Sequence, residues 1–437
     1  DAYKAQVPNG SQKEFKEADQ RVNLLYNAIE GKAIKIFPVP NDDNNKWISP
    51  IEFRDEGYRE KIKDSLLGNF IKNGFGAYLI TLNKAKQTGD YSKAEDLLTG
   101  IKKTQQKYGS AVMLSDKKVS TEITYNKYDI FKKLFSWYMY AGTLMIIFLI
   151  VQIFKDRSKF VKISVIIFRW IVIGLFLLHT GGLITRWYLS GHAPWSDAYE
   201  SMIYVAWATM FFGLCFGRKS DLTIASTAFV TSIILMVAHW NWMDPSISNL
   251  EPVLDSYWLM IHVAVIVMSY GPFTLGMVLG AVSLLLMAFS NHKNKDKLLL
   301  SIKELTIINE MSLTVGLILL TIGNFLGGMW ANESWGRYWG WDPKETWALI
   351  SIMVYAFVIH MRLVPGLRGR FGFNLASIIA YASILMTYFG VNFYLSGLHA
   401  YASGDQIVSL KFILITVAIV AILGFFAYRK YRLYYKK

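Results

Sequence analysis

Long apolar stretches separated by short polar loops dominate the chain from about residue 133 onward. Each stretch has roughly 20 residues, the length that a helix needs to cross a hydrocarbon core of ~30 Å. Because a helix satisfies its own backbone hydrogen bonds in lipid, these stretches predict transmembrane helices. The predicted helices cover residues 133–154, 161–185, 199–216, 222–239, 257–290, 307–328, 346–362, 373–396 and 407–428.

The first 130 residues differ from the rest because they are polar and rich in lysine, with helix-like stretches such as YSKAEDLLTGIKKTQQKYG at 91–109. We therefore predict an all-α polytopic membrane protein with about nine transmembrane helices and an N-terminal soluble domain of mixed or mainly helical structure. The predicted domains are the soluble domain 1–132, the single transmembrane helix 133–154 and a membrane domain 155–437 with a tryptophan-rich loop at 329–346. Asp1 is not a start methionine and no signal peptide is recognisable, so we expect the later part of a longer precursor.

The formal net charge of +14 raises the possibility of a nucleic-acid partner, but the position of the charges argues against one. Alternate loops are rich in Lys and Arg, as in KDRSKFVK, NHKNKDK and MRLVPGLRGR, whereas the loops between them contain only Arg186, Arg337 and Lys344. The positive-inside rule places the basic loops in the cytoplasm. We therefore expect a bacterial inner membrane protein whose soluble domain and tryptophan-rich loop face the periplasm.

Cysteine is almost absent from the chain. Cys215 is the single one, so the sequence contains no internal disulfide and no CxxC redox or zinc motif. Any thiol chemistry must therefore be carried out on, or by, a partner.

Seven histidines occur in the chain, and a histidine in or beside a membrane helix is a candidate for function, although it can also simply bond to a neighbouring helix. Helix 257–290 would be about 50 Å long. Counting back from its basic loop places His262 beyond the hydrocarbon core on the outer side, and the same count places His399 there. Two imidazoles beside an aromatic loop suit a flat, apolar, iron-bearing ligand such as heme.

The other histidines have different surroundings. His360 lies at the inner end of its helix and belongs to a second site if it binds a ligand. His179 is inside a helix, His192 and His239 flank outer loops, and His292 lies in a basic loop where we expect it to be solvated.

The stretch WGRYWGWDPKETWAL at 335–349 gathers four tryptophans, and Trp330 lies just before it. Tryptophan also forms interfacial belts, but a tight cluster interrupted by glycines exceeds what a belt needs. Stacking on such a loop suits heme, a quinone or a sugar. Asp342 and Glu345 read as an N-cap and capping-box pair for the following helix. Arg337 and Lys344 are candidate partners for heme propionates, or for Glu333 or lipid headgroups.

A family resemblance adds to this pattern. WGRYWGWDPKE, together with the order His262, tryptophan loop, His360 and His399, resembles the WWD motif and histidine order of the CcsA family, the membrane half of System II cytochrome c synthase. SGHAPWSDAYES at 190–201 is also similar to a recurrent stretch of that family. The resemblance covers about 161–437, while 1–132 and helix 133–154 resemble the C-terminal end of a CcsB-like part. The whole chain is similar to a fused CcsBA protein that lacks its N-terminal region.

The resemblance implies that heme b, as transported substrate and bound ligand, enters at an inner membrane site where His360 is one axial ligand and a CcsB-like portion supplies the other. Heme then moves to an outer site with His262 and His399 as axial ligands. There its vinyl groups react with the thiols of an apocytochrome c CxxCH motif, kept reduced by a thioredoxin-like partner. No catalytic residue apart from the iron ligands is expected. The implied heme pocket comprises Trp330, Trp335, Gly336, Arg337, Tyr338, Trp339, Gly340, Trp341, Asp342 and Trp347.

Two other functions fit the same residues. One is a heme transporter or chaperone that hands heme to a separate synthase. The other is a transporter of a non-heme ligand such as a quinone or glycan. The order of sites and the CcsB-like portion favour a holocytochrome c synthase, that is, a heme lyase.

Overall fold

The structure is a computed structural model that describes residues 10–154, 158–240, 243–247, 250, 256–395, 397–398 and 410–435. The chain forms two compact units, Asp1–Thr121 and Glu122–Lys437. His399 lies outside the described residues.

The first unit is small and mainly helical. A two-stranded antiparallel sheet pairs Phe37 with Ile48 and Pro38 with Trp47. The core beside this sheet includes Ile71 and Ile101. Asp64 is the N-cap of α3, the longest helix of this unit, and accepts hydrogen bonds from two backbone amides of its first turn. The elements are α1 Gly10–Ile29, β1 Phe37–Pro38, β2 Trp47–Ile48, η1 Glu52–Arg54, α2 Glu56–Lys61, α3 Ser65–Thr88, α4 Ser92–Tyr108 and the start of α5, Asp116–Tyr128.

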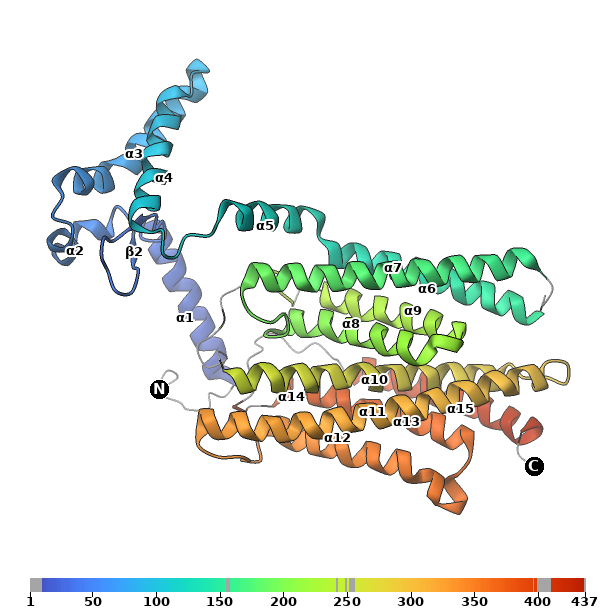
Figure 1. Cartoon of the computed structure of the whole chain (residues 1–437). Coiled ribbons are helices and arrows are strands. Elements are labelled where there is room, and N and C mark those ends of the chain that lie inside the picture. Colours follow the sequence, from blue (N-terminus) through green and yellow to red (C-terminus); the bar gives the residue numbers. More distant parts are fainter. Residues whose placement is uncertain are drawn as a thin grey trace. The chain divides into compact units, whose positions relative to one another are not determined.

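The second unit is a bundle of long helices that run roughly parallel to one another (Figure 1). Within the described residues, nine helices are long and apolar enough to cross a membrane, which confirms the predicted all-α polytopic fold. The spans correspond to α6 Ile130–Phe154, α7 Lys159–Ser190, α8 Ala198–Phe216, α9 Asp221–Ala238, α10 Tyr257–Ala288, α11 Lys295–Trp335, α12 Pro343–His360, α13 Arg370–Leu385 with its continuation to Tyr394, and α15 Leu410–Tyr434. Short turns η2 Gly217–Lys219, η4 Met361–Leu363 and η5 Pro365–Leu367 follow α8 and α12.

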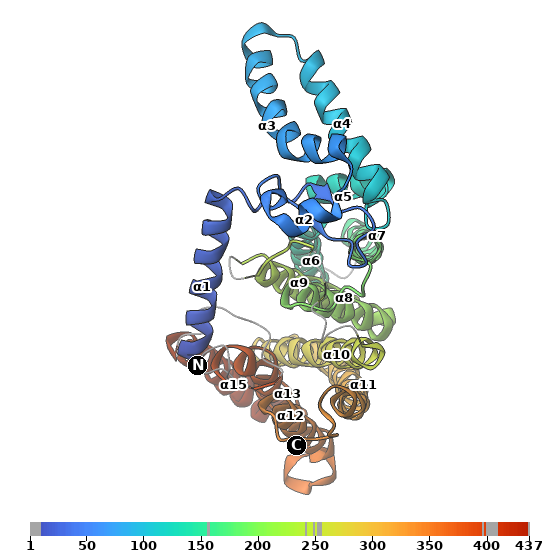
Figure 2. The same cartoon turned by 90° about the vertical axis from the view of Figure 1, so that its left-hand side faces the viewer.

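The end-on view shows α10 in the middle of this unit, between α8 and α9 on one side and α11 and α13 on the other (Figure 2). Gly271 makes this position possible, because a Cβ atom there would lie 2.7 Å from the backbone carbon of Ala208 in α8. Farther along α10, the ring of Phe273 stacks on Tyr355 of α12 with 3.9 Å between centroids. The helix continues through Pro272 without interruption.

Two helices differ in extent from the hydropathy prediction. α11 has 41 residues and begins well before the predicted 307–328, since its polar first turns contain no helix breaker. α13 is shorter than predicted 373–396, because Met386–Gly390 forms one π-helical turn, η6, before the short α14, Val391–Tyr394. Such turns occur frequently at functional sites.

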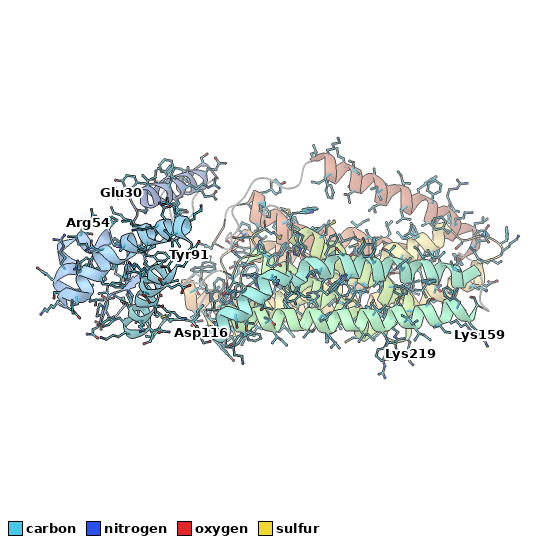
Figure 3. The ribbon with its side chains drawn as sticks, turned by 90° about the horizontal axis from the view of Figure 1, so that it is seen from above. Glu30, Arg54, Tyr91, Asp116, Lys159 and Lys219 are labelled. Carbon is cyan, nitrogen blue, oxygen red and sulfur yellow. The ribbon has the colours of Figure 1, made fainter. Side chains whose placement is uncertain are left out.

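Lys159 and Lys219 come from two loops that the charge pattern places on the same side of the membrane, and both lie toward the same end of the bundle (Figure 3). The bundle is therefore compatible with the alternation of basic and non-basic loops along the chain.

Candidate functional site

The start of α12 is built as the sequence predicts. Asp342 accepts a hydrogen bond from the Lys344 amide, the Glu345 carboxylate accepts one from the Asp342 amide, and Pro343 occupies the first turn, so the predicted capping box is confirmed. The Asp342 side chain is buried. Its role as a helix cap therefore follows from local sequence alone.

Asp342 also makes a contact that local sequence does not reveal. Its Oδ1 atom accepts a 2.6 Å hydrogen bond from the backbone amide of Leu398. Gly397 lets the chain come this close, because a Cβ atom there would lie 2.5 Å from the same oxygen. One carboxylate thus caps α12 and holds the two residues that precede His399 in the chain.

Arg337 of the tryptophan loop occupies space that Gly340 leaves open. The Arg337 guanidinium lies over the Trp335 ring and within 3.6 Å of the Glu345 carboxylate. A Cβ atom on Gly340 would collide with that guanidinium, and the Gly340 amide donates to Glu345 instead. Gly340 therefore makes room for Arg337 rather than for a ligand. Glu333, the alternative partner considered for Arg337, accepts a hydrogen bond from Ser256.

His262 is held between α10 and α11. Its Nδ1 atom lies 2.8 Å from the carbonyl oxygen of Gly323. Because a carbonyl only accepts, Nδ1 carries the proton and Nε2 carries the lone pair, the tautomer that a metal-binding imidazole needs. Gly327 leaves space for the ring, since a Cβ atom there would approach it to 2.4 Å, and Trp330 lies nearly parallel to it with 6.3 Å between centroids.

A cavity of about 690 Å³ opens beside His262. This volume is within the range of small-molecule and cofactor sites. The cavity receives Trp330, Tyr338 and Trp339 from the tryptophan loop and its approach, and Lys344 and Tyr388 from α12 and η6. Lys344 donates to the side chain of Asn392 with a 3.1 Å separation. The lining also includes the carboxylates of Asp197, Asp244 and Glu345. The wall is therefore largely aromatic and apolar, with one cation and three carboxylates among its polar groups.

Several residues of the predicted pocket do not line this cavity. Asp342 and Arg337 lie behind the wall in the contacts described above, and Trp341 is 70% exposed with a backbone φ of +58°. Gly336 ends α11 with a left-handed backbone. The predicted pocket residues that lie outside the lining are Trp335, Gly336, Arg337, Gly340, Trp341, Asp342 and Trp347.

Another part of the wall comes from residues 192–201, which comprise the stretch between α7 and α8 and the first turn of α8. His192 and Ser196 line the cavity, and the His192 Nδ1 atom lies 3.2 Å from both the Ala193 carbonyl and the Ser196 hydroxyl. Trp195 donates its indole N–H to the carbonyl of Met260, two residues before His262. A hydrogen bond therefore joins this wall to the turn of α10 that carries His262.

Arg186 lies behind that wall and is fully buried. Its Nε atom donates to Glu200 at 2.7 Å, and its two terminal nitrogens donate to the carbonyls of Pro245 and Ser246. One side chain thus joins α7, α8 and the loop after α9. From the sequence pattern, Arg186 is predicted only as a charge of a loop, so its buried position is not foreseen.

Asp197 also belongs to this wall. Its loss of solvent on burial and the nearby Glu200 carboxylate raise its pKa to about 6, against the opposing effects of its hydrogen bond from the Glu200 amide and of the Arg186 charge. The carboxylate is therefore ionised above about pH 6 and becomes neutral below it.

The other four histidines of the described residues do not line this cavity. His360 is exposed at the end of α12 with its Nδ1 atom bonded to the Ala356 carbonyl, which leaves the lone pair on Nε2. His179 is buried in α7 and bonded to the carbonyl of Ile203 in α8. His239 bonds to its own helix and His292 packs on Tyr434. Within the described residues, no group of three His, Cys, Asp or Glu side chains is arranged to hold a metal ion.

Comparisons with known proteins agree on one family. Residues 195–399 match the model of the cytochrome C assembly protein family. The chain is 35% identical over 293 residues to the cytochrome c biogenesis protein CcsA of Prochlorococcus marinus (strain MIT 9301), covering 60% of this chain and 93% of that protein. It is also 42% identical over 396 residues to Protein NrfI of Wolinella succinogenes, covering 90% of this chain but only 42% of NrfI.

A solved structure, the cytochrome c heme lyase CcmF, matches 69% of this chain and 51% of its own length, with a TM-score of 0.45 and 15% identity.

Proposed function

The chain belongs to the CcsA family of cytochrome c biogenesis membrane proteins, and on that premise we propose that it exports heme and presents it at the outer face for covalent attachment to apocytochrome c. The observation that carries the proposal is the cavity beside His262, where an oriented imidazole, aromatic walls and a cation surround one space. In this proposal the first unit and α6 form part of a CcsB-like portion, and the cavity and the first unit face the periplasm.

The residues present fit heme as the substrate. His262 offers a lone pair on Nε2, Trp330 and Trp339 offer apolar surface, and Lys344 offers a charge for a propionate. His399 is the proposed second axial ligand of this outer site, and Asp342 holds the residues before it. His360 is the proposed ligand of the inner site.

The proposed reaction adds each CxxCH thiol across one heme vinyl group. A carbon–sulfur bond forms at one vinyl carbon and the other carbon gains the proton, so no net oxidant or reductant is consumed. The protein orients the two reactants and excludes water. The thiols must be reduced beforehand, which assigns that task to a separate thioredoxin-like reductant.

Coexpression tests this function. The chain, together with a CcsB-like N-terminal portion, is expressed with an apocytochrome c in cells that lack other maturation systems. We expect a Soret band in the purified protein and a covalent heme–cytochrome product on a heme-stained denaturing gel. An apocytochrome whose two motif cysteines are serine is the control. A Soret band without product would leave a heme chaperone, and absence of both would favour a quinone or glycan ligand.

Asp342→Ala should reduce product formation beyond what the loss of a helix cap explains. The change removes a cap worth about 1 kcal/mol and also frees the backbone at Leu398, so a ligand at His399 would be held less firmly. Added imidazole should partly restore product. The measurement is covalent product per purified protein.

Ser158→Ala is the matched control, because Ser158 caps α7 through the Val161 amide and, within the described residues, has no second segment to hold. If both variants lose the same fraction of product, Asp342 acts only as a cap.

A further inference from the structure

A second cavity, of about 360 Å³, lies at the other end of α12 from the tryptophan loop. Its walls come from α11, from the end of α12 with the following turn, and from the start of α13. The loop from Arg362 to Arg370 that borders it is one of the basic loops, which the charge pattern places in the cytoplasm. The proposed heme chemistry makes no use of this cavity.

The cavity has an excess of positive charge. Its lining contains four cationic side chains, Lys303, Arg362, Arg368 and Arg370, and one carboxylate, Glu310. Arg362 forms an ion pair with Glu310. Among the interactions of the described residues, the side chains of the other three cations have no carboxylate partner. A lining with three cations more than it has carboxylates favours an anionic ligand.

The same cavity also has an apolar part. Ile307 of α11, Ile359 of α12 and Phe373 of α13 line it together with the cations. An amphipathic molecule with an anionic head satisfies both parts of the lining. Because the cavity lies where three membrane helices reach their basic ends, the level of the lipid headgroups, the chemistry matches basic pockets between transmembrane helices that bind anionic headgroups.

Heme is the other amphipathic anion in this system, and the geometry disfavours it here. His360 is exposed and does not line this cavity, whereas Ile359 and Arg362, on either side of it in sequence, do. On a helix with 3.6 residues per turn, His360 therefore faces away from the direction that Ile359 and Arg362 share. A heme ligated by His360 would lie on a different side of α12.

We propose that this cavity binds the phosphate of an anionic phospholipid of the inner leaflet, with Lys303, Arg368 and Arg370 as its ligands. The bound lipid joins the basic ends of α11, α12 and α13. This binding is independent of heme, so it can be measured on the heme-free protein.

The test compares the purified wild-type chain with Arg368→Gln/Arg370→Gln in nanodiscs of phosphatidylcholine containing or lacking phosphatidylglycerol. We expect phosphatidylglycerol to remain bound to the wild type in native mass spectrometry and to raise its melting temperature. The double variant should bind it at least 10-fold more weakly and show equal melting temperatures in both lipids. Lys219→Gln, at the same end of the bundle but outside the cavity lining, should behave as wild type (Figure 3).

Two results would overturn the proposal. One is equal retention of phosphatidylglycerol by the wild type and the double variant, provided that circular dichroism shows both to be folded. The other is loss of hemin binding in the double variant while phosphatidylglycerol binding is unchanged, which would assign the cations to heme carboxylates. If the double variant does not fold, Lys303→Gln is tested in its place. We expect it to bind phosphatidylglycerol more weakly than the wild type does. Binding equal to that of the wild type would contradict the proposed site.

Discussion

His262→Ala should abolish covalent heme attachment and remove heme from the outer site. The hydrogen bond to the Gly323 carbonyl fixes the imidazole so that the lone pair is on Nε2, the atom proposed to bind the iron. Loss of a partner behind a metal ligand costs 10–100-fold in affinity, so loss of the ligand itself should cost at least about 100-fold. The measurements are covalent product and the Soret spectrum of purified protein. Added imidazole should restore part of both.

His239→Ala is the matched control, because His239 also lies at the outer end of a helix and bonds through Nδ1 to a carbonyl, but does not line the cavity. Gly327→Ala is a second variant that keeps the imidazole but places a methyl group where the ring now lies. It should shift the heme spectrum and lower product. Normal product from His262→Ala would refute the outer-site assignment.

Arg186→Ala should be the most destabilising single change. It removes the charged donor of the buried Glu200 carboxylate, which keeps only the Ser196 amide, and it leaves two backbone carbonyls without their donor. Breaking a buried pair from one side costs about 3–5 kcal/mol. The expected result is a large fall in the melting temperature of the heme-free protein, with loss of the cavity wall formed by 192–201.

Arg169→Ala is the control on the same helix, since Arg169 pairs with Asp221 where both side chains are about one-third exposed. An exposed pair of this kind is worth about 0–1 kcal/mol. Arg186→Met/Glu200→Leu should be more stable than Arg186→Ala, because neither buried charge then remains unpaired. A melting temperature for Arg186→Ala close to that of Arg169→Ala would show that the buried pair contributes little.

Local and periodic features of this fold can be predicted from the sequence. The nine membrane helices follow from hydropathy, and the cap at Asp342 follows from the order Asp, Pro, Lys, Glu, because both depend on neighbouring residues. Their ends are harder to predict, since hydropathy marks only the part of α11 that lipid surrounds and not the polar turns that continue it.

The tertiary contacts of the site cannot be predicted from the sequence in this way. No spacing in the chain indicates that Trp195 bonds to the turn carrying His262, that Arg186 gathers three segments, or that Asp342 binds Leu398. Each contact joins residues that are distant in sequence, and each depends on how helices pack. Gly397 and Gly327 leave space for Asp342 and His262, but only the fold shows which residues they face.

α12 connects the two places where iron is proposed to bind. Its N-cap, Asp342, holds Leu398, and its 18 residues, about 27 Å of helix, end at His360. If the helix moves as a rigid body, a shift of its first turn along the axis is also a shift of its last turn. By thermodynamic reciprocity, any coupling that lets occupancy at the outer end alter affinity at the inner end must act equally in reverse.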